Sequence, residues 1–228
     1  MFKPCLTINL SFYAYNIGLQ IHRQVQACCR EFQRWTPGVG PGGRAARLAT
    51  LAKVLRALMP LVGEVPDAEW ATAKLYAPHV AAVLAQLQVL GAEPSEAAAE
   101  LLVRSARYAA NVLCDFRQAL QYQQRYLEAC RALAGEEDAT VALALFDEAK
   151  LYRQLGQYEQ ALEWHLLALE LHQALFAGDN ADVASSLNGV GLAYRRLGRH
   201  EEGLQYYQRA LRMQEAVHKG ADHEDVAT

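Results

Sequence analysis

The C-terminal part of the chain repeats itself every 42 residues, and this period constrains the fold more than any other feature of the sequence. A shift of 42 positions places Tyr152-Arg153 on Tyr194-Arg195 and gives 13 identities over the 38 positions 141–178. A weaker copy, with 9 identities over residues 99–136, precedes these two. A fourth copy begins at Asp225, where Asp-Val-Ala returns. Such a period is typical of stacked helical or solenoid units.

The placement of proline indicates which secondary structure the units adopt. All seven prolines lie in the first 94 residues, and none follows Ser95. Proline is least tolerated inside helices, and the remaining stretch is rich in Ala, Leu, Gln, Glu and Arg, which are strong helix formers. We therefore predict an all-α fold from residue 95 onward.

Each unit has the pattern of two helices joined by a tight turn. In the last copy, Val183, Leu187 and Val190 recur at steps of three and four residues, as on one face of a helix. Gly198 follows where a helix C-terminus favours a residue with positive φ. A second helix is expected at about residues 201–217. Small residues stand where the two helices should cross: Gly191, Gly203 and Ala210.

The string from Leu192 to Leu211, LAYRRLGRHEEGLQYYQRAL, resembles a tetratricopeptide repeat. The 42-residue period and the boundary 220–227, GADHEDVA, are similar to the kinesin-light-chain subclass of that family. The resemblance covers about residues 96–228. It implies an α-α superhelix of helical hairpins, with a concave groove that binds a protein or peptide partner.

The N-terminal part carries a second resemblance. Residues 21–30, IHRQVQACCR, are similar to the His-Arg-Leu-Val-Gln motif that ends the winged-helix region of NB-ARC signalling proteins with tetratricopeptide sensors. Residues 75–80, LYAPHV, resemble the segment that joins winged helix to repeats in those proteins. This resemblance implies the C-terminal sensor part of such a protein. The expected organisation is a partial winged-helix-like segment (1–36), a Gly/Pro linker (37–44), a helical connector (45–94) and the repeat array (95–228).

Composition and motifs exclude several other classes of function. The formal net charge is −3, which argues against a dedicated nucleic-acid binder, and no run is apolar enough to span a membrane. The start lacks the pattern of a signal peptide, and the five cysteines contain no CxxC pair, so we expect a cytoplasmic protein with reduced thiols. The glycines of residues 38–43 match GxGxxG, but a helical segment precedes them where a dinucleotide site needs a strand.

Chemistry-bearing residues do not form a recognisable site. His165 and His172 lie two helical turns apart, about 10 Å, which is too far to share a metal. No serine lies in a GxSxG elbow. We predict no catalytic residues, no cofactor and no metal, and hence a protein that is not an enzyme.

The register of the repeats predicts which residues face the concave groove. They belong to the first helix of each copy: Arg104, Tyr108, Asn111, Phe146, Asp147, Lys150, Arg153, Asn188, Leu192, Arg195 and Arg196. Among them are five bases and one acid, although the whole chain is slightly acidic. Two interpretations remain open. The bases hold an acidic peptide, or the arginines near helix C-termini complement the helix dipole.

Two further hypotheses concern partners. The chain could instead be a nucleic-acid-binding regulator that uses the winged-helix-like segment. Self-association through the last helix is also expected, because its apolar face is the one that a following repeat normally covers.

Overall fold

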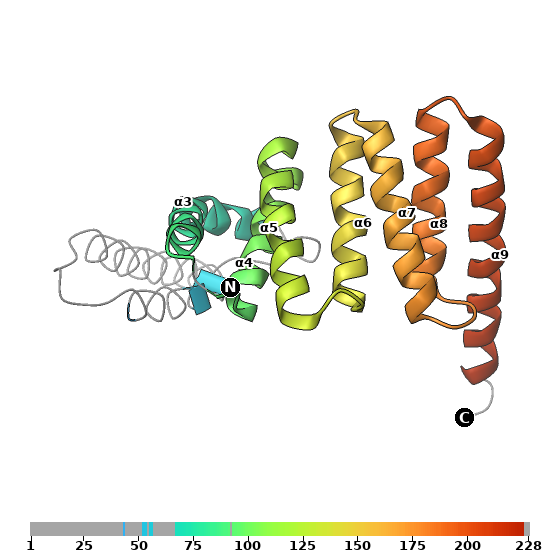
Figure 1. Ribbon diagram of the computed structural model, residues 1–228, viewed down its shortest axis with the longest axis horizontal. Coiled ribbons are helices and arrows are strands. Elements are labelled where there is room, and N and C mark those ends of the chain that lie inside the picture. Colours follow the sequence, from blue (N-terminus) through green and yellow to red (C-terminus); the bar gives the residue numbers. More distant parts are fainter. Residues whose placement is uncertain (1–42, 44–51, 54, 57–66, 92, 226–228) are drawn as a thin grey trace, which may run out of the picture. The chain divides into compact units, whose positions relative to one another are not determined.

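The computed structural model describes residues 43, 52–53, 55–56, 67–91 and 93–225. The described residues contain helices and no strand, and the helices labelled in Figure 1 run from α3 to α9. The chain divides into two compact units, Met1–Ser105 and Ala106–Thr228. The all-α prediction is confirmed for the described part. The partial winged-helix segment (1–36) lies outside it.

The first unit contains α3 (Asp67–Val89) and most of α4 (Glu96–Asn111). Pro78 lies inside α3, where it removes one backbone hydrogen bond. Tyr76, Val80 and Leu84 are nevertheless buried at 1% exposure each, so burial of this face stabilises the helix despite the proline. Arg56 forms a salt bridge with Glu100 at 3.1 Å.

The second unit takes up the end of α4 and five further helices. They are α5 (Phe116–Ala134), α6 (Ala139–Gln154), α7 (Tyr158–Leu175), α8 (Ala181–Arg196) and α9 (His200–Asp225). Both ends of α8 lie 42 residues after those of α6, and α9 begins 42 residues after α7. Successive helices pack side by side from α5 to α9, and α6 also contacts α8 (Figure 1). The predicted helical pairs are therefore confirmed, although α9 extends past its expected end at residue 217.

The repeat boundaries are fixed by local backbone chemistry. The side chains of Asp138 and Asn180 cap α6 and α8 by accepting hydrogen bonds from the first-turn amides of Thr140 and Asp182. Gly198 ends α8 with φ of 78°, as its position predicts. Cys114 occupies the corresponding place after α4 and has φ of 52°, which costs more for a residue with a Cβ atom.

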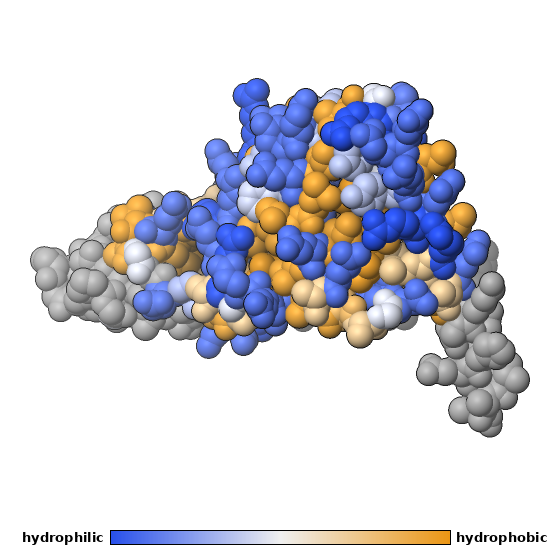
Figure 2. Space-filling model, turned by 45° about the vertical axis from the view of Figure 1, so that its right-hand side comes forward, coloured by the Kyte–Doolittle hydropathy of each residue, from blue (hydrophilic) through white to orange (hydrophobic). Residues whose placement is uncertain are grey.

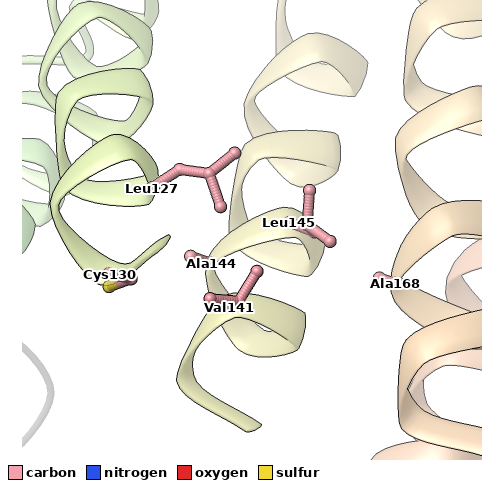
Figure 3. Packing of buried hydrophobic residues seen from close by; sticks show 6 residues of the cluster. All are labelled: Leu127, Cys130, Val141, Ala144, Leu145 and Ala168. Atoms are coloured by element: carbon pink, nitrogen blue, oxygen red, sulfur yellow. The ribbon is translucent and has the colours of Figure 1, made fainter. Parts of the chain in front are cut away.

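The core between α5, α6 and α7 is built from small and branched side chains. Its buried cluster is shown in Figure 3: Leu127, Cys130, Val141, Ala144, Leu145 and Ala168. Ala144 and Ala168 have no exposed surface, so these helices approach one another through methyl groups. A close crossing of this kind leaves no space for larger side chains.

The last hairpin crosses more closely, through glycines. A Cβ atom on Gly191 of α8 would lie 3.1 Å from the carbonyl oxygen of Gly203 on α9. The predicted role of Gly191 and Gly203 is thus confirmed. Near the turn, the rings of Tyr194 and Tyr206 stack with centroids 5.4 Å apart. Tyr152 and Trp164 form the equivalent stack 42 residues earlier, at 6.2 Å.

Candidate functional site

Three arginines lie in the last turns of α6 and α8, the first helices of two successive hairpins. Arg153 is in the last turn of α6, and Arg195 and Arg196 are in that of α8. Arg153 is half-buried, whereas Arg195 and Arg196 are exposed. We call these three residues the arginine surface.

The other two predicted bases already have acidic neighbours. Lys150 Nζ lies 2.9 Å from Asp147 Oδ1, and Arg107 approaches the same carboxylate at 3.8 Å. Arg104 belongs to the first unit, where it pairs with Glu100 and donates a hydrogen bond to the Arg56 carbonyl oxygen. Lys150 and Arg104 therefore carry less available positive charge than the sequence alone suggests.

The arginine surface lacks such partners among the described residues. The salt bridges formed by that part of the chain involve neither Arg153 nor Arg195 nor Arg196. The Arg153 Nε atom is buried and donates no hydrogen bond. A half-buried guanidinium without a partner pays part of its desolvation cost without compensation, so an incoming anion is favoured there.

The apolar members of the predicted groove differ in accessibility. Phe146 is partly buried, and Lys150 Nζ lies 5.5 Å from the centre of its ring. Leu192 is also partly exposed, and Asn111 and Asn188 are fully accessible polar residues. Tyr108 is only 5% exposed, and burial raises the pKa of its hydroxyl. It has little surface to offer a ligand.

His165 of α7 lies beneath these side chains, and the sequence did not assign it this role. Its ring is 1% exposed, its centroid lies 5.2 Å from that of Phe146, and neither ring nitrogen has a hydrogen-bond partner. Burial, together with the positive charges of Arg153 and Lys150, lowers its pKa to about 4. The imidazole is thus neutral near pH 7. The position 42 residues later is Tyr207, so the repeat alignment already marks an aromatic packing position.

Gly189 of α8 makes room for this ring. A Cβ atom at residue 189 would lie 2.7 Å from the His165 ring and 3.1 Å from Phe146. Glycine is thus required by space and not by backbone conformation. The three residues connect α6, α7 and α8 directly below the arginine surface.

A second buried polar group, Glu148, was also missed by the sequence reasoning. Its side chain is 1% exposed, and its Oε2 atom has no hydrogen-bond partner. Burial raises its pKa, while hydrogen bonds with Gln124 and Tyr152 and the charge of Arg131 partly oppose that rise. The alignment gives a signal, because the residue 42 positions later is the core residue Val190.

Two other buried polar side chains are satisfied within the fold. Gln123 donates to the Ala144 carbonyl oxygen at 3.0 Å. His172 Nδ1 lies 2.8 Å from the hydroxyl oxygen of Ser186, which joins α7 to α8. These contacts explain the polar atoms as packing elements.

Catalytic and metal chemistry find no constellation in the part of the chain that is described. No group of three His, Cys, Asp or Glu residues there is arranged to hold a metal ion. None of the described helices combines the length and apolarity that crossing a bilayer requires. The arginine surface is therefore the candidate site.

Comparison with known proteins gives two kinds of match. The tetratricopeptide repeat family matches residues 140–216 and again 182–228. No curated protein sequence matches the chain significantly.

Solved structures resemble the chain at the level of the fold. BtubC (BKLC) from P. vanneervenii is 21% identical, with a TM-score of 0.56 and coverage of 86% of this chain and 91% of that one. A putative kinesin light chain with nearly identical TPR-like repeats from Podosopora anserina is 14% identical, with a TM-score of 0.55 and coverage of 88% and 97%. Both identities are low, so these neighbours bear on architecture only.

Proposed function

Residues 140–228 are tetratricopeptide repeats with a kinesin-light-chain-like fold, and from this we propose that the chain is a protein-interaction module that holds an acidic peptide between its first helices. The repeat family is in general a non-catalytic interaction scaffold. In the proposal, the module serves as the sensor or scaffold part of a cytoplasmic signalling protein.

The proposal depends most on the lack of partners at the arginine surface. Lys150 is held by Asp147 at 2.9 Å, whereas Arg153 has no acidic neighbour among the described residues and a buried Nε atom without a hydrogen bond. Arg195 occupies the repeat-equivalent position of Arg153 on α8. Charge-assisted bonds from a guanidinium to a carboxylate are among the stronger hydrogen bonds in proteins.

Apolar contact would accompany these ion pairs. Phe146 and Leu192 are partly exposed on the same two helices. A ligand that alternates acidic with leucine or phenylalanine side chains matches this combination of charge and apolar surface. Tyr108 is excluded from the contact set because it is 5% exposed.

The competing interpretation is that the arginines only complement the helix dipoles. In its favour, both Arg153 and Arg195 lie in last turns, where a positive charge is typically worth about 0.3–1 kcal/mol. That role needs no ligand and predicts a loss of stability on charge reversal. Peptide binding predicts a loss of affinity instead.

The experiment compares two double variants with the same change in charge. Fluorescence anisotropy would measure binding of a labelled peptide that alternates Glu with Leu and Phe, and of its Gln counterpart. Arg153→Glu with Arg195→Glu should reduce affinity for the acidic peptide at least tenfold, with unchanged helicity. Arg117→Glu with Arg212→Glu, on exposed faces of α5 and α9, should retain affinity.

Two results would contradict the proposal. One is equal binding of the acidic peptide and its Gln counterpart by the wild-type chain. The other is equal loss of affinity in both double variants, which would show a general charge effect. If the groove variant melts at lower temperature and no peptide binds, the arginines are helix caps.

A further inference from the structure

The last helix, α9, exposes leucines that the repeat pattern buries elsewhere. Leu204 is 56% exposed and Leu211 is 55% exposed. Their equivalents 42 residues earlier are Leu162 and Leu169 of α7. Leu169 is only 5% exposed, because both α7 leucines pack in one cluster with core residues of α8. The outer face of α9 is thus the continuation of the face of α7 that α8 covers.

The exposed face of α9 is narrower than its counterpart on α7. Leu204 and Leu211 are seven residues apart, about 10 Å, and lie nearly in line along the helix. Tyr207 lies between them, with its ring held against α8 near Gly191. Gln208 stands where α7 has Leu166, a partly buried member of the α7–α8 cluster. We call Leu204, Tyr207 and Leu211 the α9 seam.

A seam with leucines seven residues apart suits a pair of helices more than a full repeat layer. A repeat layer needs a wide apolar stripe, such as α7 offers with Leu162, Leu166 and Leu169. Glutamine at residue 208 breaks that wide stripe. A two-helix contact uses a narrow line of apolar residues with polar flanks.

The charges along α9 are self-complementary when two copies run antiparallel. Glu201 and Glu202 lie in the first turn, whereas Arg209 and Arg212 follow in the second half of the seam region. Antiparallel helices place the acidic end of one beside the basic part of the other. Their helix dipoles also oppose each other favourably. A parallel pairing would bring like charges together.

We propose that the α9 seam binds the same seam of a second copy of this chain, with the two helices antiparallel. A twofold axis between Tyr207 and Gln208 places Leu204 opposite the partner's Leu211, twice in the dimer. It also places Gly203 opposite the partner's Arg212, so that Glu202 lies near that arginine. This interaction is separate from ligand binding at the arginine surface. In Figure 2, which brings the α9 side forward, apolar and hydrophilic surface lie side by side on the visible face.

The test uses charge substitutions whose effects depend on this register. Sedimentation equilibrium of the full chain should show a mass that rises with concentration toward that of a dimer. Leu204→Lys alone and Leu211→Glu alone should each weaken dimerisation at least tenfold. The two substitutions in one chain should restore it, because lysine then faces the partner's glutamate at both contacts.

A matched control uses leucines of similar exposure elsewhere. Leu143 on α6 and Leu167 on α7 are 45% and 43% exposed, so Leu143→Lys with Leu167→Glu makes the same change in charge away from the seam. This control should dimerise as the wild type does. Circular dichroism of every variant should show unchanged helicity, since all four leucines are exposed.

Three outcomes would overturn the proposal. A wild-type chain that stays monomeric at every accessible concentration excludes the dimer. A dimer that the single variants do not weaken, or that the double variant does not restore, uses another surface or register. A monomer whose seam binds a synthetic peptide of residues 180–197, the α8 segment, would assign the seam to the first helix of another repeat.

Discussion

Gly203 of α9 lies so close to Gly191 of α8 that a Cβ atom on Gly203 would come within 2.9 Å of the Gly191 carbonyl oxygen. That oxygen belongs to the backbone, so it can move only if the two helices separate. The previous hairpin has alanines at the equivalent positions 149 and 161, and both are fully buried. The last hairpin is therefore the more closely packed of the two.

Enlarging Gly203 should destabilise the last hairpin. We expect Gly203→Leu to lower the free energy of unfolding by about 1–3 kcal/mol, because overpacking forces the helices apart. Urea denaturation followed by circular dichroism measures this. Gln205→Leu, an exposed position on the same helix, serves as control and should change stability little. Equal stability of the two variants would show that α9 crosses α8 at another residue.

Ala168 provides the same test in the middle hairpin. It has no exposed surface and belongs to the cluster between α5, α6 and α7. Ala168→Trp should destabilise the array by about 1–3 kcal/mol or unfold it locally. Its neighbour Leu167 is 43% exposed, so Leu167→Trp should be tolerated. Thermal melting of both variants checks the assignment, and full stability of Ala168→Trp would mean that the register of this helix pair is wrong.

His165 should make the protein sensitive to acid. Its pKa is about 4 in the folded chain, against 6.5 for an ordinary histidine, because of burial and the nearby charges of Arg153 and Lys150. The unfolded chain therefore binds a proton first as the pH falls below 6.5. The resulting loss of stability grows to about 3 kcal/mol near pH 4, from a shift of about 2.5 pH units.

Replacing His165 by phenylalanine isolates this effect. His165→Phe keeps an aromatic ring next to Phe146 and removes the titrating group. Urea denaturation between pH 7.5 and pH 4.5 should show a smaller loss of stability for the variant than for the wild type. His200→Phe, at an exposed position at the start of α9, is the control and should follow the wild-type curve. Parallel curves for His165→Phe and wild type would contradict the low pKa.

Glu148 should have the opposite dependence on pH. Burial raises its pKa in the folded chain, so its contribution to stability is greatest at low pH, below its unfolded pKa. That contribution is lost as the pH rises through the folded pKa. Glu148→Gln removes the charge and keeps hydrogen-bonding capacity toward Gln124 and Tyr152. The variant should gain stability over the wild type between pH 5 and pH 8 in urea denaturation, and a constant difference across that range would exclude the raised pKa.

Much of the fold could be read from the sequence because a repeat reports packing at every period. The identities between residues 141–178 and 183–220 predicted two helical pairs, and the structure has α6 and α8 at the same spacing. Glycine at residue 198 predicted the end of α8, since few other residues adopt positive φ without cost. Gly191 and Gly203 predicted a close crossing for the same kind of local reason.

The candidate site could be predicted only as a set of positions. Helical periodicity indicates that Lys150, Arg153 and Arg195 share a series of first helices, but it does not indicate whether each charge is already paired. Lys150 is paired with Asp147, whereas Arg153 has no acidic partner among the described residues. Tyr108 was expected to be accessible and is 5% exposed.

The sequence by itself determined the repeat length, the helical pairs and the small residues at their crossings, because these depend on near neighbours along the chain and on a pattern that recurs. Only the tertiary structure decided which polar groups are buried and which charges remain available. Glu148 and His165 lie among side chains from neighbouring helices, and their pKa values depend on that burial and on those charges. Such surroundings are assembled from residues distant in sequence, so no local pattern encodes them.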